Sequence, residues 1–246
     1  MSYIKTPNLP TSKVKTVIVS DTDRKIVDFI KSFGIETLFT KANPSIDVSI
    51  SKHADINAFY SDNRKIILDK SQEELSEILE NRGVTVKNPK EAVCGLYPKD
   101  CLLNCAVVGN RIITRVVSTD KTIIDDYKPN QIIDVKQGYT RCSICIVNEN
   151  AIITDDPSIY KACQKQSIEA LLIDKGDIVL PGHDYGFIGG ASSLIDKDKM
   201  LFFGDIRKHR DFEKIDVFLK KHGCKYDYLS GHALTDIGGM VLIEEE

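Results

Sequence analysis

The chain has 246 residues, of which 42% are hydrophobic and 28% charged, and its formal net charge is −3. This length is sufficient for one globular domain, while the slightly acidic balance without a basic cluster argues against nucleic acid as a partner. No run approaches the roughly 18 consecutive apolar residues of a membrane helix, and residues 1–12 lack the sections of a signal peptide. We therefore expect a soluble, cytoplasmic protein with no membrane partner.

The N-terminal residues 1–12 are polar and are predicted to form an arm outside the folded domain, which takes up residues 13–246. The domain opens with a strand, a helix and a second strand, predicted at residues 15–19, 23–33 and 35–39.

After this opening the chain repeats one pattern four times: a strand, a short polar turn, a second strand, a helix and a third strand. The first copy is predicted at residues 55–60, 65–68, 71–82 and 84–87, with its turn at Asp62-Asn63. The second is predicted at 102–108, 111–117, 121–127 and 131–135, the third at 142–147, 151–154, 157–167 and 169–173, and the fourth at 190–195, 200–203, 212–222 and 225–229.

A fifth copy is split between the two ends of the chain. Ile188-Gly189-Gly190 of the fourth copy returns as Ile237-Gly238-Gly239, and each triplet begins five residues after a histidine, His183 or His232. Only one strand, at residues 236–243, follows before the chain ends, and the N-terminal strand, helix and strand supply the missing part. A repeat divided in this way predicts a closed ring without exposed sheet edges.

The seven cysteines are predicted to be reduced core thiols, because their number is odd and no export signal accompanies them. Cys142 and Cys145 are three residues apart on a predicted strand, so their side chains face opposite sides. They are therefore poorly placed to hold one zinc ion.

Strand, strand, helix and strand, repeated five times around an axis, resembles the five-bladed α/β propeller of the guanidine-modifying enzymes, the pentein fold. The fifth blade would be closed by the N- and C-terminal segments. The motifs GYTRCSICIV (138–147), YGFIGGASS (185–193) and GDIRKH (204–209) are similar to those of an uncharacterised bacterial family with this fold. The wider superfamily includes deiminases, dimethylarginine hydrolases, amidinotransferases and a non-catalytic ribosome anti-association factor.

The resemblance implies a reaction in which a cysteine thiolate from the last repeat attacks a guanidinium carbon. A histidine assists, and carboxylates hold the cationic substrate on the axis. In this chain the last repeat, residues 231–246, contains no cysteine. The nucleophile that the resemblance implies is therefore missing from its expected place.

In such a ring the residues at the start of each blade's first strand converge on the axis. Three of the five histidines fall at these positions. The converging residues are His53, Asp55 and Asn57, then Asp100 and Asn104, then Tyr139, Arg141 and Cys142, then His183 and Asp184, and finally His232, Thr235 and Asp236. The paired glycines beside them either let strands approach closely or expose backbone that forms one wall of a ligand site.

In the preferred scheme the protein is a hydrolase acting on a guanidino, amidino or related C–N bond. Cys142 is the nucleophile, its pKa lowered by Arg141, and His183 or His232 moves protons. No cofactor is predicted, and no residue is assigned as a metal ligand. The residues assigned to substrate binding are His53, Asp55, Asn57, Asp100, Asn104, Arg141 and Asp236.

Structural explanations and two other functions remain open. Cys142 could be an ordinary core residue, and Asp55 could cap a strand end beside a loop histidine. The histidines and aspartates could instead form a metal-dependent amidohydrolase-like site. The ring could also be a non-catalytic binding module for an amino or guanidino compound. A small-molecule ligand is expected in each case, whereas the oligomeric state has no signal in the sequence.

Overall fold

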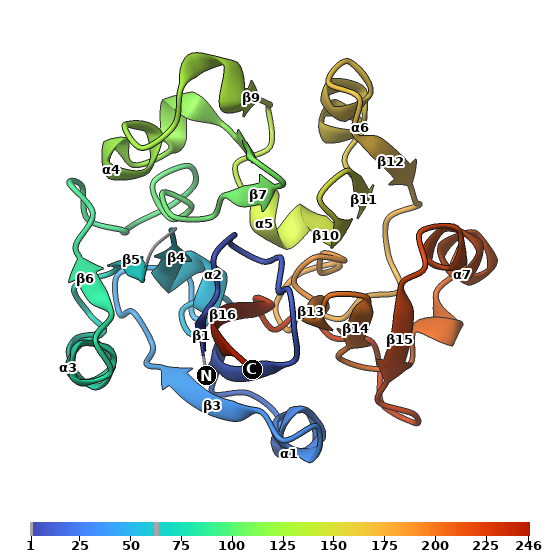
Figure 1. Ribbon diagram of the computed structural model, residues 1–246, viewed down its shortest axis with the longest axis horizontal. Helices are drawn as coiled ribbons and strands as arrows, with labels where there is room; N and C mark the ends of the chain where they lie inside the picture. Colours follow the sequence, from blue (N-terminus) through green and yellow to red (C-terminus); the bar gives the residue numbers. More distant parts are fainter. Residues whose placement is uncertain (1, 62–63) are drawn as a thin grey trace.

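Five small β-sheets surround a central axis in the computed structural model, which describes residues 2–61 and 64–246 (Figure 1). The helices that connect the parallel strands of each blade lie on the outside of the ring (Figure 1). The predicted turn at Asp62-Asn63 lies outside the described residues. No helix in the described part is long and apolar enough to cross a membrane.

Four of the sheets contain three strands each, in chain order. The first strand pairs antiparallel with the second, which pairs parallel with the third across a helical connection. Blade one holds α2 (Ala54–Asn57), β4 (Ala58–Tyr60), β5 (Lys65–Leu68), α3 (Glu73–Asn81) and β6 (Thr85–Lys87). Blade two holds β7 (Ala106–Val108), β8 (Arg111–Thr114), the 3₁₀ turns η1 (Val116–Ser118) and η2 (Pro129–Gln131), α4 (Lys121–Ile124) and β9 (Ile132–Asp134).

The third and fourth blades follow the same plan. Blade three holds α5 (Thr140–Ser143), β10 (Ile144–Asn148), β11 (Ala151–Thr154), α6 (Pro157–Gln164) and β12 (Glu169–Leu172). Blade four holds β13 (Ser192–Asp196), β14 (Lys199–Phe202), the 3₁₀ turn η3 (Ile206–Lys208), α7 (Phe212–Lys221) and β15 (Lys225–Tyr228).

The fifth blade joins the two ends of the chain, as the split repeat predicts. Its strands are β1 (Ser2–Tyr3), β2 (Val14–Ser20), β3 (Glu36–Thr40) and β16 (Met240–Glu245), and α1 (Arg24–Ser32) connects β2 to β3. The C-terminal strand β16 pairs antiparallel with β2, with Val241 opposite Ile18. The predicted α/β propeller with a shared fifth blade is therefore confirmed.

The N-terminal segment differs from the predicted arm outside the ring. Strand β1 pairs with β16, and Ile4 is fully buried. The buried carboxylate of Glu245 accepts hydrogen bonds from the backbone N–H of Thr11 (2.6 Å) and of Ser12 (3.0 Å). These hydrogen bonds replace those that the backbone of this segment would otherwise make to water. Residues 2–12 therefore lie against the ring.

The chain near the axis also differs from prediction, because α2 and α5 occupy positions expected to begin strands. Side-chain amides supply hydrogen bonds there that a neighbouring strand supplies elsewhere. Asn57 Nδ2 donates to the backbone oxygens of Ser51 and His53, both at 2.9 Å. Asp55 and Cys142 therefore project from single helical turns at the inner end of their blades.

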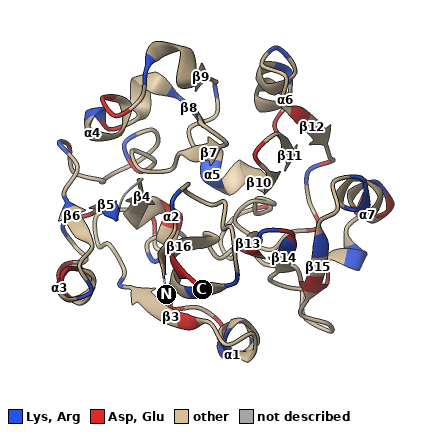
Figure 2. Ribbon diagram, in the orientation of Figure 1, with Lys and Arg blue, Asp and Glu red and all other residues tan. Residues whose placement is uncertain are grey.

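The apolar core lies between the sheets and the outer helices. Strand β10 is buried from Ile144 to Val147 because both of its faces are covered. Helix α7 buries Ile215, Phe218 and Leu219, which share one face at helical spacing. Charged residues of both signs lie on the outer helices and loops (Figure 2). The free cysteines are Cys94, which is half-buried, and Cys101, Cys105, Cys142, Cys145, Cys163 and Cys224, which are buried.

Candidate active site

Cys142 and Asp55 meet at the axis, where α5 and α2 bring them into contact. The Cys142 thiol donates a hydrogen bond to Asp55 Oδ2 at 2.9 Å. Asn104 holds the two turns together: its Nδ2 donates to the Asp55 backbone oxygen and to Cys142 Sγ, both at 3.1 Å. Its Oδ1 accepts from the backbone N–H of Arg141 at 2.8 Å and of Cys142 at 3.2 Å. Asn104 is thus a positioning residue.

His53 and Asp236 complete the buried cluster. His53 Nδ1 lies 3.9 Å from Asp236 Oδ1, and both side chains are buried. The Asp236 carboxylate accepts from the backbone N–H of Phe187 at 2.9 Å and of Gly238 at 3.0 Å. Within the described part of the chain, His53 Nδ1 and Asp55 Oδ1 are buried without a hydrogen-bond partner. Two polar atoms in the cluster are therefore available to a ligand.

Nearby glycines bring the backbone close to this cluster. A Cβ on Gly190 would lie 1.8 Å from Asp236 Oδ1. A Cβ on Gly238, whose φ is +76°, would lie 2.5 Å from the Cβ of His53. Of the two explanations open for the paired glycines, the close approach of chain segments accounts for both contacts.

Burial controls the protonation of the cluster. Burial raises the pKa of Asp55 to about 6, against the opposing effect of His53. The pKa of the Cys142 thiol is raised well above its ordinary value, first by burial and then by the charges of Asp55 and Asp236. At neutral pH the free protein therefore holds a neutral thiol that donates to a carboxylate.

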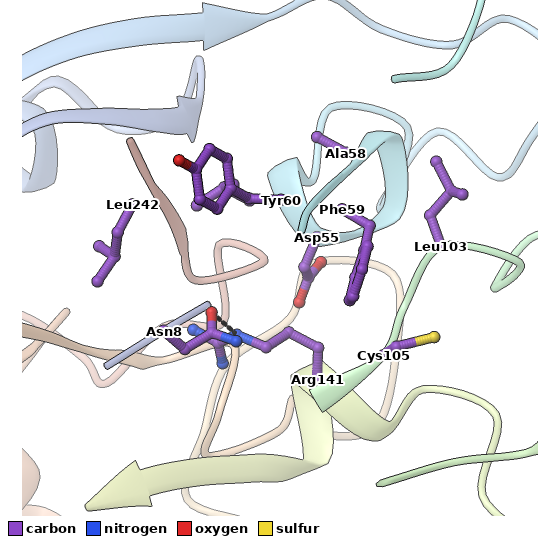
Figure 3. A pocket seen from close by; sticks show the side chains of 10 residues that line it. Asn8, Asp55, Ala58, Phe59, Tyr60, Leu103, Cys105, Arg141 and Leu242 are labelled. Atoms are coloured by element: carbon purple, nitrogen blue, oxygen red, sulfur yellow. Dashed lines mark hydrogen bonds between the residues drawn. The ribbon is translucent and has the colours of Figure 1, made fainter. Parts of the chain in front are cut away.

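The pKa of Cys142 is raised and not lowered as the sequence predicts, and Arg141 is not among the leading causes of the shift. Its guanidinium Nε donates to Asn8 Oδ1 at 3.2 Å (Figure 3). Its Nη1 donates to the backbone oxygen of Gly189 at 3.1 Å. Arg141 and Asn8, together with Asp55, line a small cavity of about 20 Å³.

A larger cavity of about 260 Å³ reaches Cys142 and shares no lining residue with the small one. One wall is aromatic: the ring of Tyr139 lies 6.4 Å from Phe187, which lies 6.1 Å from Tyr185. The lining residues are Ile50, His53, Ile56, Tyr139, Cys142, Leu180, His183, Asp184, Tyr185, Phe187 and Asp236.

The three predicted axial histidines line two adjoining cavities, and His53 lines both of them. His53 is in the buried cluster, whereas His183 is exposed at the cavity mouth, with Nε2 2.7 Å from Ser49 Oγ. His232 lines an adjoining cavity, with Nε2 3.3 Å from Asp23 Oδ2, and is not among the residues that line the cavity of Cys142. That adjoining cavity is also lined by His53 and Asp236, so His232 shares a cavity with the buried cluster but does not reach Cys142.

Two other predicted binding residues have structural contacts. Asn57 fixes the start of α2, as described above. Asp100 accepts a hydrogen bond from the Tyr139 hydroxyl and so orients one ring of the aromatic wall. The sequence analysis missed Tyr185 and Phe187, although their alternation immediately before Gly189 is a visible signal.

His53, Asp55 and Cys142 also form a possible metal-ligand set. One ligand atom from each lies within 4.8 Å of the others, and all three residues are buried. Imidazole, carboxylate and thiolate are ligands that zinc accepts. The same three groups can therefore serve as a nucleophile with acid and base groups, or as a metal site.

The same fold occurs in solved enzymes that modify guanidino groups. The inosamine-phosphate amidinotransferase of Streptomyces griseus is 11% identical, with a TM-score of 0.64 over 99% of this chain and 97% of that chain. An amidinotransferase of the saxitoxin pathway of Microseira wollei is 10% identical, with a TM-score of 0.60 over 98% of each chain. Agmatine deiminase of C. jejuni is 11% identical, with a TM-score of 0.59 over 99% of this chain and 97% of that chain.

These similarities define a protein of the pentein fold, and at such identities they establish the fold alone. A comparison with curated proteins found no match. The chain belongs to a family of unknown function, DUF6873, whose model matches residues 17–241.

Proposed function

We propose that this protein cleaves a C–N bond of a small guanidino or amidino compound, with Cys142 as the nucleophile. The observation that carries the proposal is the 2.9 Å contact between Cys142 Sγ and Asp55 Oδ2, with His53 beside it, where a cavity reaches the axis. The structural similarity to amidinotransferases and to an agmatine deiminase supports this class of reaction.

In the proposed reaction, Cys142 Sγ attacks the central carbon of the substrate while its proton passes to Asp55. The S–C bond forms, and the C–N bond breaks when the departing nitrogen receives that proton through Asp55 and His53. Water then attacks the amidino carbon, the S–C bond breaks and the thiol is restored. A guanidinium and water thus yield a urea and ammonium, and no electrons are exchanged with another reactant.

The raised pKa of Cys142 fits this scheme when the substrate is a cation. In the free protein the carboxylates of Asp55 and Asp236 disfavour a thiolate. A guanidinium or amidinium bound beside them offsets this negative charge and lowers the pKa of the thiol. The nucleophile is therefore activated by the substrate itself, in place of the Arg141 expected from the sequence.

The test is release of ammonia or amine from a panel of small guanidino and amidino compounds. We expect Cys142→Ala to lower turnover by roughly 10³-fold or more. Cys145→Ala is the matched control, because Cys145 is an equally buried thiol that contacts Met200 Sδ at 3.3 Å and does not line the cavity. Turnover that survives in Cys142→Ala refutes the nucleophile. Binding without consumption of any compound by the wild type identifies a binding module instead.

Metal-dependent hydrolysis is the second candidate, favoured by the two buried atoms without partners, His53 Nδ1 and Asp55 Oδ1. His53, Asp55 and Cys142 would hold a zinc ion, which would polarise the substrate or activate water. The measurement is turnover after treatment with a chelator and after readdition of zinc. Full turnover in the chelated protein rejects this candidate, and turnover restored only by zinc supports it.

A further inference from the structure

The charges around the mouth of the cavity select one chemical class of ligand. Among the described residues that line it, the carboxylates are Asp184 at the exposed mouth and Asp236 at the buried end. Asp55 lies directly behind, in contact with Cys142. None of these lining residues is lysine or arginine. A ligand that enters therefore meets negative charge at both ends of the cavity.

Two basic groups close to the lining residues already have partners. Lys175 Nζ lies 5.5 Å from the centroid of the Tyr185 ring, and the hydroxyl of that tyrosine, followed by Asp155, raises the pKa of Lys175. Arg141 donates to Asn8 Oδ1 and to the backbone oxygen of Gly189, and it does not line the cavity. A carboxylate on the ligand would thus face Asp184 without a basic partner in the lining.

The aromatic wall suits the uncharged part of a ligand between these two ends. The rings of Tyr139, Phe187 and Tyr185 line the cavity side by side, and their apolar surface can pack against an aliphatic chain. The volume of about 260 Å³ corresponds to roughly nine water-sized groups at ~30 Å³ each. A guanidino head on a short aliphatic amine has about this size.

We propose that the ligand is a guanidino or amidino compound whose tail carries an amine, and that the site disfavours the carboxylate of an amino acid. The guanidino head lies against Cys142 and Asp236, the aliphatic part lies along the aromatic wall, and the amine faces Asp184. This inference rests on the proposed function for the position of the head, and it adds the chemistry of the tail and a specificity role for Asp184.

Three probes test the tail separately from the head. Agmatine and arginine differ by one carboxylate, and methylguanidine has the head without a charged tail. Binding is measured by calorimetry on the full chain carrying Cys142→Ala, which prevents turnover. We expect agmatine to bind at least about tenfold more tightly than arginine, because like charges at a binding site are strongly unfavourable.

Replacing Asp184 locates the tail. We expect Asp184→Asn to weaken agmatine binding by roughly two- to fivefold, the range of an exposed ion pair, and to leave methylguanidine binding unchanged. Asp28→Asn is the control, because it removes one negative charge from the outer helix α1, away from the cavity. An equal loss in both variants, or none in Asp184→Asn, refutes the role of Asp184.

The outcomes separate the two proposals. If arginine binds as tightly as agmatine or more tightly, the inference about the tail is wrong and the proposed head site survives. If none of the three probes binds, the proposed function fails, and the inference fails with it.

Discussion

Asp55→Asn tests the energetics of the axial cluster directly. Burial places the folded-state pKa of Asp55 at about 6, against an ordinary value of 3.8. A raised pKa means that the folded protein binds the proton more tightly than the unfolded chain does. The contribution to stability is therefore complete below the unfolded pKa and is lost as the pH rises through the folded pKa.

The size of the effect follows from the same two values. Over the whole window Asp55 contributes about 3 kcal/mol, of which about 2 kcal/mol falls between pH 7.5 and pH 4.5. Asparagine does not titrate, so the variant lacks this gain on acidification. Any change in its hydrogen bonds with Cys142 shifts its stability by a similar amount at both pH values and cancels in the comparison.

The assay is urea-induced unfolding of both proteins at pH 4.5 and pH 7.5. Asp155 provides a positive control, because burial also raises its pKa to about 6. Asp155→Asn is expected to remove a similar share, and the double variant to remove both. If the free energies of unfolding of wild type and Asp55→Asn change in parallel between the two pH values, the buried, proton-binding Asp55 described here is refuted.

Two further predictions concern the packing around the site. Gly238→Ala is expected to lower the free energy of unfolding by several kcal/mol more than Gly34→Ala. Both glycines have a φ of +76°, but an added Cβ would lie 2.5 Å from the Cβ of His53 at Gly238 and would meet nothing within 4 Å at Gly34. Equal losses in Tm would contradict the close contact. Glu245→Ala removes the charged acceptor of the backbone N–H groups of Thr11 and Ser12, so we expect a loss of about 1–3 kcal/mol and faster proteolysis within residues 1–12. An unchanged cleavage rate would contradict the docking of this segment.

The ring itself could be predicted from the sequence because its signal is repeated. The Ile-Gly-Gly triplets ending at Gly190 and Gly239 revealed the split copy, and a split copy requires closure. The N-terminal segment carries no such repeat. Its docking depends on Glu245. This residue is buried only once the sheet of the fifth blade has formed, so its burial cannot be predicted from the polar C-terminal sequence.

The candidate site was only partly predictable for a related reason. Position along the repeat brought Asp55 and Cys142 together, since equivalent positions converge on the axis. The directions of Arg141 and His232 depend on a helical turn and on a loop, where side chains do not follow the alternation of a strand. The protonation state of Cys142 could not be predicted either, because its pKa is governed by burial more than by Arg141, its neighbour in sequence.

The most direct test of the account compares two alkylating reagents of the same shape. Chloroacetamidine is a cation and chloroacetamide is neutral, and each forms an S–C bond with a thiol as chloride leaves. Mass spectrometry of the digested protein gives the rate at each cysteine. An acidic cavity that guides a cation to Cys142 predicts faster alkylation of Cys142 by the amidine, and a smaller preference in Asp55→Asn. Equal rates of alkylation of Cys142 by the two reagents would contradict it. So would a larger preference for the amidine at another cysteine than at Cys142.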